Sequence, residues 1–139
     1  MDYRDAAQEL MNVLLSAPQA KAERQIFQRL RGQGFILIYL AMNQNRTHPK
    51  NLSSSLMVSS ACIAEILRKL EKEAVITRSI DAEDNRQVVV SLTEKGMQQA
   101  EQYWKETLES VTEMLEYLGP EDAQAYMRIR KKLLGMSRK

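Results

Sequence analysis

The chain has 139 residues, of which 44% are hydrophobic and 27% are charged, with one cysteine and a net charge of +2. This composition excludes a mainly disordered chain and a disulfide scaffold, and the near balance of 20 basic and 18 acidic residues gives no general indication of nucleic-acid binding. Because no apolar run of about eighteen residues occurs and the start Met1–Asp5 is charged, we expect no membrane partner, no secretion signal and a cytoplasmic protein.

The first part of the chain is expected to be helical. Residues 3–15 carry a narrow apolar stripe at helical spacing, and a polar connector over 16–25, which contains Pro18, leads to a second helix running towards Gly32. The apolar stretch 35–42 suits either a buried strand or a buried helix. Its length and its ending favour a helix.

Two short helices separated by a tight turn are expected next. Pro49 suits the first position of a helix that ends near Met57, and Ser59 suits the N-cap of the following helix. Steps of three and four residues give this second helix one buried face, formed by Ile63, Ile66, Leu67 and Leu70. This arrangement is typical of a helix-turn-helix.

The pattern then changes from helical to extended. Residues 75–80 and 87–92 are typical of strands, and the turn-rich polar link 81–86 between them predicts a hairpin that flanks the helix-turn-helix as a wing. Thr93 suits the N-cap of the helix that follows.

Two long helices are expected at the end of the chain. Residues 94–118 repeat apolar side chains at near-heptad spacing, and Gly119–Pro120 separates this helix from a last amphipathic one. A small domain cannot bury all the apolar faces of its terminal helices, so the pattern favours a homodimer.

The residues give no pattern for catalysis or metal binding. There is no Ser/His/Asp or Cys/His arrangement, and carboxylates lie beside basic residues at helical spacing, as Glu65 does with Lys69. His48 is the only histidine and has no cluster of ligands near it in the sequence, which disfavours a zinc site. We therefore expect neither an enzyme nor a bound cofactor or metal.

Residues 81–86 (Asp-Ala-Glu-Asp-Asn-Arg), followed by Leu-Thr-Glu-Lys-Gly at 92–96, resemble the wing signature of the MarR family of bacterial transcription regulators. The two short helices before the wing resemble the family's helix-turn-helix, and the likeness extends over nearly the whole chain. It implies a mainly α fold (an α+β winged helix) with a winged helix-turn-helix lobe over 31–96. It also implies a helical dimerisation lobe, formed by the N- and C-terminal helices at 1–30 and 97–139.

The resemblance also implies a function. It predicts a sequence-specific DNA-binding transcriptional regulator, more often a repressor, that acts as a homodimer on a pseudo-palindromic operator in double-stranded DNA. Many members are released by a small aromatic or phenolic ligand between the lobes. Met42, Tyr39 or Trp104 could line such a ligand pocket, although core packing is the commoner role for these residue types.

Individual DNA-binding positions follow from the resemblance. Arg86 falls on the wing arginine that enters the minor groove, and Asp84 falls on the acidic position that braces it. The leading and exposed positions of the recognition helix, which we also assign to DNA, are Ser59, Ser60, Ala61, Cys62, Glu65, Arg68 and Lys69.

Some residues depart from the family pattern. Cys62 replaces a frequent serine or threonine, Glu65 replaces a frequent arginine, and Ala74 replaces the glycine that usually ends the recognition helix. A glutamate cannot bind guanine acceptors and repels phosphate. Because residues 46–96 carry 8 basic and 7 acidic side chains, the alternative is a winged-helix interaction module that has lost DNA binding.

Overall fold

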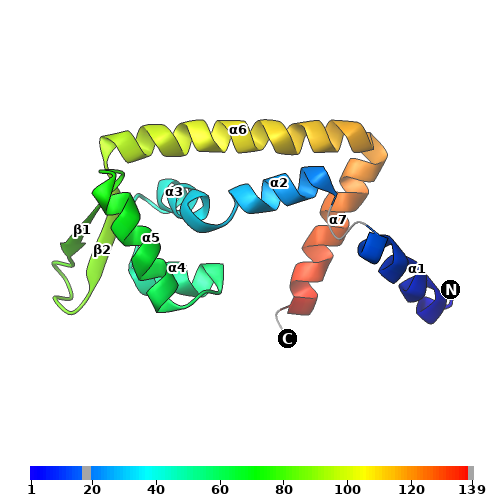
Figure 1. Ribbon diagram of the computed structural model, residues 1–139, viewed down its shortest axis with the longest axis horizontal. Helices are drawn as coiled ribbons and strands as arrows, with labels where there is room; N and C mark the ends of the chain where they lie inside the picture. The colour runs from blue at the N-terminus through cyan, green and yellow to red at the C-terminus, as the bar shows by residue number, and fades with distance from the viewer. Residues whose placement is uncertain (17–19, 138–139) are drawn as a thin grey trace. The chain divides into compact units, whose positions relative to one another are not determined.

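The computed structural model describes residues 1–16 and 20–137, so Pro18 lies outside the described residues. The described chain is helical apart from one hairpin, as predicted, and none of its helices is long and apolar enough to cross a membrane. The elements in chain order (Figure 1) are α1 (Tyr3–Ser16), α2 (Lys21–Arg29), α3 (Gly32–Met42), α4 (Pro49–Leu56), α5 (Ser60–Lys72), β1 (Ile76–Ile80), β2 (Val88–Leu92), α6 (Glu94–Leu118) and α7 (Pro120–Ser137).

The chain forms two compact units, one of residues 28–109 and one of residues 1–27 with 110–139. The boundary along α6 follows Glu109, because the first part of this helix buries Ala100 and Thr107 within the first unit. The dimerisation role of the terminal helices stays a prediction. The predicted connector over 16–25 was too long, since α2 already begins at Lys21.

The unit of residues 28–109 is built around a single apolar core. The stretch that suited either a strand or a helix is the helix α3, and its side chains are buried on most sides, which explains why it shows no clear helical periodicity. The predicted face of α5 is buried at all positions except Ile66, which is partly buried. The most completely buried side chains of the core are Ile36, Leu40, Leu52, Ile63, Leu67, Leu70, Val75, Ile76 and Val90.

The turn between α4 and α5 has the geometry of a helix-turn-helix. Met57 ends α4 in the left-handed conformation at φ 57°, and the amides of Met57 and Val58 donate to the carbonyls of Ser54 and Ser53 at 3.3 and 3.2 Å. The Ser59 hydroxyl accepts from the Cys62 amide at 3.1 Å, which confirms the predicted N-cap. The direction of α5 is therefore fixed by local hydrogen bonds at its first residue.

The entry into the wing is fixed by a second left-handed residue. Ala74 has φ 62°, and the amides of Ala74 and Val75 donate to the carbonyls of Glu71 and Leu70 at 3.0 and 2.9 Å. This is a Schellman ending, in which glycine is usual because a Cβ crowds the left-handed backbone. Ala74 therefore occupies a backbone conformation that glycine adopts with less strain.

The hairpin and the start of α6 pack tightly on this ending. β1 and β2 pair antiparallel with Ile76 opposite Leu92 and Ile80 opposite Val88. The Thr93 hydroxyl accepts from the Gly96 amide at 3.1 Å, which confirms the predicted cap. A Cβ at Gly96 would clash with the Val75 carbonyl, so a glycine is needed where α6 passes the strand entry.

The unit of residues 1–27 and 110–139 has little core of its own. α1 has no buried residue, and Ile26 and Ala123 are the buried apolar residues of the unit's described part. The Tyr126 hydroxyl donates to Glu23 at 2.9 Å, and Arg130 lies over the Phe27 ring at 5.3 Å. Exposed apolar side chains of α1 and α7 are Leu10, Met11, Val13, Leu14, Leu15, Met127, Ile129, Leu133, Leu134 and Met136.

We predict that Ala74→Gly stabilises the protein. Removing the Cβ relieves about 1–2 kcal/mol of left-handed strain, and the greater freedom of the unfolded glycine chain offsets about half of this gain. A net increase of about 0.5–1 kcal/mol in the free energy of unfolding is expected from urea titration. The control Ala64→Gly lies in the middle of α5, the helix that ends just before Ala74, and should destabilise the protein by a similar amount. If Ala74→Gly changed the free energy of unfolding in the same direction and by the same amount as Ala64→Gly, the strain assigned to the left-handed backbone of Ala74 would be wrong.

Candidate nucleic-acid interface

The recognition helix α5 presents most of its assigned residues to solvent. Its outward stripe contains Ala61, Glu65 and Arg68 at steps of four and three residues, opposite the buried face. Ser59, Ser60 and Lys69 are also exposed, whereas Cys62 is only partly exposed. The assigned residues of α5 thus form one accessible surface, and their contact with DNA stays a prediction.

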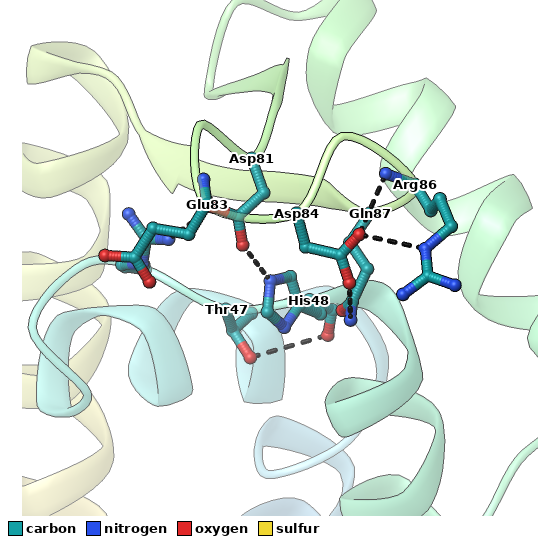
Figure 2. Close-up of polar contacts among 8 residues, drawn as sticks. Thr47, His48, Asp81, Glu83, Asp84, Arg86 and Gln87 are labelled. Atoms are coloured by element: carbon teal, nitrogen blue, oxygen red, sulfur yellow. Dashed lines mark hydrogen bonds and ion pairs between the residues drawn. The ribbon is translucent and has the colours of Figure 1, made fainter.

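The wing carries the predicted pair of Asp84 and Arg86. One carboxylate oxygen of Asp84 accepts from Nε and from the backbone amide of Arg86, both at 3.1 Å, and the other accepts from Gln87 Nε2 at 3.1 Å (Figure 2). The Arg86 side chain is 90% exposed. The hydrogen bonds from Arg86, and then that from Gln87, hold the pKa of Asp84 below its usual value. Asp84 therefore stays ionised and holds the arginine at the surface of the wing.

A buried carboxylate at the base of the wing was missed by the sequence reasoning. Asp81 has a side chain only 6% exposed and accepts from the Glu83 amide at 2.9 Å, His48 Nε2 at 2.8 Å and Arg46 Nη2 at 3.2 Å. Hydrogen bonds from Glu83 and then His48 hold the pKa of Asp81 below its usual value. Figure 2 shows Asp81 beside His48, a residue that the sequence had placed in an unremarkable loop.

The loop that carries His48 is itself joined to the hairpin. The Thr47 amide donates to the Val90 carbonyl at 3.2 Å, and the Val90 amide donates to the Thr47 carbonyl at 2.8 Å. The side-chain amide of Asn45 bonds both backbone groups of Leu92, at 2.6 and 3.2 Å. Residues 45–48, just before α4, thus hold β2 by hydrogen bonds to its backbone. The same residues hold the turn of the wing through the contacts of Arg46 and His48 with Asp81.

The basic side chains of the unit differ in their availability. Arg78 makes a two-point contact with the carboxylate of Glu71 at 2.9 and 3.3 Å, which ties β1 to α5. The hydrogen bond from Arg78 holds the pKa of Glu71 below its usual value, so the pair stays ionised. The side chain of Arg86, by contrast, bonds Asp84 through Nε alone.

Between the wing and the start of α4 lies a hollow of about 430 Å³ lined by His48, Pro49, Lys50, Asp84, Arg86, Gln87 and Val88.

An apolar cavity of about 510 Å³ lies between α3 and the first half of α6. Two of the three residues that the sequence had offered for a ligand pocket, Met42 and Trp104, line it, and Tyr39 does not. The charged groups of the lining are the carboxylates of Glu94 and Glu101. The remaining lining residues are Ile38, Ala41, Met97, Gln98 and Ala100. In the described part of the chain, no group of three or more His, Cys, Asp or Glu residues could hold a metal ion.

Comparison with known proteins gives the same architecture. Residues 29–103 match the family model described as "Transcriptional regulator SarA/Rot". The HTH-type transcriptional regulator SarZ of Staphylococcus aureus is 30% identical over 63 residues, which span 45% of this chain and 43% of the relative. The chain therefore matches less than half the length of this curated relative.

Solved structures match almost the whole chain. The S. aureus MepR–DNA complex has a TM-score of 0.68 at 22% identity and covers 94% of this chain and 96% of its own. AbsC, a MarR family transcriptional regulator from Streptomyces coelicolor, has a TM-score of 0.71 at 19% identity and covers 99% of this chain and 96% of its own. At these identities the likeness shows a shared fold.

Proposed function

The chain belongs to the SarA/Rot family of transcriptional regulators and has the MarR-type winged-helix fold, and from this premise we propose that it is a homodimeric, sequence-specific DNA-binding repressor. The solved MepR chain of the same fold was crystallised with DNA, which supports double-stranded DNA as the partner. The single observation that carries the proposal is the exposed Arg86 held by Asp84 on the wing.

The geometry of Arg86 suits a DNA groove. The ion pair with Asp84 uses Nε, so both terminal nitrogens of the 90% exposed side chain are available to an acceptor outside the protein. A guanidinium matches the narrow, electronegative minor groove and the phosphates that border it. Because Asp84 already orients the side chain, less rotamer freedom is lost when DNA binds.

The recognition helix would supply the sequence preference. Glu65, at the centre of the outward stripe, can accept a hydrogen bond from cytosine N4 and is repelled by phosphates. Arg68 and Lys69 supply positive charge on the following turn. This combination favours an operator whose half-sites place a cytosine opposite Glu65, a different preference from relatives with arginine there.

A homodimer is proposed because the terminal helices expose apolar side chains that a single chain leaves uncovered. α1 has no buried residue although Leu10, Leu14 and Leu15 are at least 49% exposed. Burying such a surface against a second copy releases water and gives two recognition helices that can reach successive major grooves about 34 Å apart. Two-fold symmetry would then match a pseudo-palindromic operator.

An effector site is proposed in the cavity between α3 and α6. Its volume of about 510 Å³ lies within the range of small-molecule sites, and its lining is mainly apolar. Carboxylates on Glu94 and Glu101 and the Trp104 indole favour an apolar aromatic cation over a phenolate. A ligand with a higher affinity for a conformation that does not bind DNA would weaken operator binding.

The second candidate, a winged-helix interaction module that no longer binds DNA, has its own support. Residues 46–96 carry 8 basic and 7 acidic side chains, and Glu65 lies on the exposed stripe. Selection of genomic DNA fragments by the purified protein at physiological salt separates the two candidates. Enrichment of a common inverted repeat supports the regulator, and fragments recovered at random would favour the interaction module.

We predict that Arg86→Ala weakens binding to every DNA sequence about tenfold and lowers the salt dependence of the binding constant by about two, one unit for each protomer. The reason is that one cation per protomer no longer displaces counterions from DNA. The measurement is a salt titration of DNA affinity by fluorescence anisotropy. Arg128→Ala, which removes an exposed arginine of α7, is the matched control and should leave both quantities near those of the parent. Identical salt-titration curves for Arg86→Ala and Arg128→Ala would mean that Arg86 of the wing does not contact DNA.

We predict that Leu14→Asp converts the dimer into a monomer, because it places a charge in the apolar face of α1. Sedimentation equilibrium measures the change in mass. Asn12→Asp adds the same charge on the opposite face of α1 and should leave the dimer intact. A dimer that survives Leu14→Asp would place the interface elsewhere.

We predict that tetraphenylphosphonium binds more tightly than tetraphenylborate, an anion of the same shape. Quenching of Trp104, the single tryptophan of the chain, reports occupancy of the cavity directly. The double change Glu94→Gln and Glu101→Gln should weaken cation binding several-fold, whereas Glu109→Gln, further along α6, should have no effect. Equal affinities of the parent for the two ions would contradict a cation site.

A further inference from the structure

The contact between His48 and Asp81 joins two parts of the unit that are far apart in sequence. His48 occupies the N-cap position of α4, and its side chain accepts no cap hydrogen bond from the backbone amides of that helix. Its Nε2 lies 2.8 Å from a carboxylate oxygen of Asp81, the first residue after β1. The Asp81 side chain is 6% exposed and the His48 side chain 25%, so the pair is shielded from solvent on the carboxylate side.

The position of Arg86 depends on this contact through a short, closed turn. The Asp81 amide donates to the Gln87 carbonyl and the Gln87 amide donates to the Asp84 carbonyl, both at 2.9 Å. Asp84 in turn holds Arg86. Residues 81–87 are therefore linked by hydrogen bonds within the turn, and the side chain of Asp81 joins this turn to His48 at the start of α4.

We propose that the His48–Asp81 pair is a proton-dependent positioning contact for the wing, through which operator affinity rises as the pH falls across the titration range of histidine. The inference rests on the proposed DNA-binding function and adds a mode of regulation to the same site. A neutral imidazole can donate one hydrogen bond to Asp81, whereas an imidazolium adds the attraction of opposite charges. Histidine is the side chain that ordinarily changes charge between about pH 8 and 6.

The neighbouring charged groups leave Asp81 as the natural counter-ion of His48. Asp84 is already bonded to Arg86 and Gln87, and Arg46 approaches the other oxygen of Asp81 at 3.2 Å with a side chain 54% exposed. Lys50 and Arg86 line the same hollow as His48, and Glu83 contributes its backbone amide to Asp81. Because hydrogen bonding keeps the pKa of Asp81 low, its carboxylate stays ionised over this pH range.

The sign of the effect follows from these charges. A protonated His48 binds the ionised Asp81 more strongly and holds the wing in place, and the charge attraction is lost when the imidazole is neutral. A partly shielded ion pair of this kind corresponds to about a two- to fivefold change in affinity.

The test uses two conservative variants of the full-length protein. His48→Gln keeps a side-chain donor for Asp81 and cannot titrate, and Asp81→Asn keeps the shape of the carboxylate and removes its charge. DNA affinity is measured from pH 8 to 6 at constant ionic strength. We expect the parent to bind about two- to fivefold more tightly at pH 6 and both variants to show no such change.

Two results would overturn the proposal. An unchanged pH dependence in His48→Gln would mean that another group titrates. A pH dependence that survives in Asp81→Asn but disappears in His48→Gln would mean that the imidazolium attracts DNA phosphate directly.

A measurement on the free protein separates this inference from the proposed function. The Glu83 amide donates to Asp81, so its NMR shift should follow the titration of the His48 imidazole in the parent and stay constant in His48→Gln. A Glu83 amide shift that stays constant as the pH is changed would contradict the proposed His48–Asp81 contact, even if the protein binds DNA. Absence of DNA binding by the parent would instead overturn the proposed function. Neither the NMR titration of the Glu83 amide nor the measurement of DNA binding by the parent requires Asp81→Asn, so both can be made even if that variant fails to fold.

Discussion

The position of the wing depends on one buried carboxylate. Asp81 is charged and nearly enclosed, a state that is costly unless donors surround it, and it receives hydrogen bonds from the Glu83 amide, His48 and Arg46. Two of these donors come from the segment before α4, which also pairs with β2 through Thr47. The hairpin is therefore tied through Asp81 to the segment before α4, and the exposed Arg86 lies on the turn that this contact positions.

Helix ends set the remaining geometry of this unit. Met57 and Ala74, both in the left-handed conformation, follow the ends of α4 and α5. The hydroxyls of Ser59 and Thr93 cap the N-termini of α5 and α6. These local bonds fix the angles at which consecutive elements meet, and the apolar core then holds them together. The strain at Ala74 is tolerated because Leu70 and Val75, on either side of the turn, are both buried.

Charge in this protein is organised locally, which reconciles a net charge of +2 with a family of DNA-binding regulators. Arg78 makes a two-point ion pair with Glu71, whereas the side chain of Arg86 bonds Asp84 through Nε alone and is 90% exposed. Carboxylates on the first half of α6 face an apolar cavity. Counting charges along the sequence cannot separate these roles, because each depends on which side chains the fold brings together.

The sequence by itself determined the order of helices and strands and the caps at Ser59 and Thr93, and its resemblance to the MarR family predicted the pairing of Asp84 with Arg86. The helices, strands and caps involve residues a few positions apart, so local spacing and side-chain chemistry suffice to predict them. Only the tertiary structure decided that His48 and Arg46 meet Asp81, that Arg78 meets Glu71, and which side chains enclose the cavity beside Trp104. Such contacts depend on packing between elements that are distant in the chain, and one sequence carries no local signal for that packing.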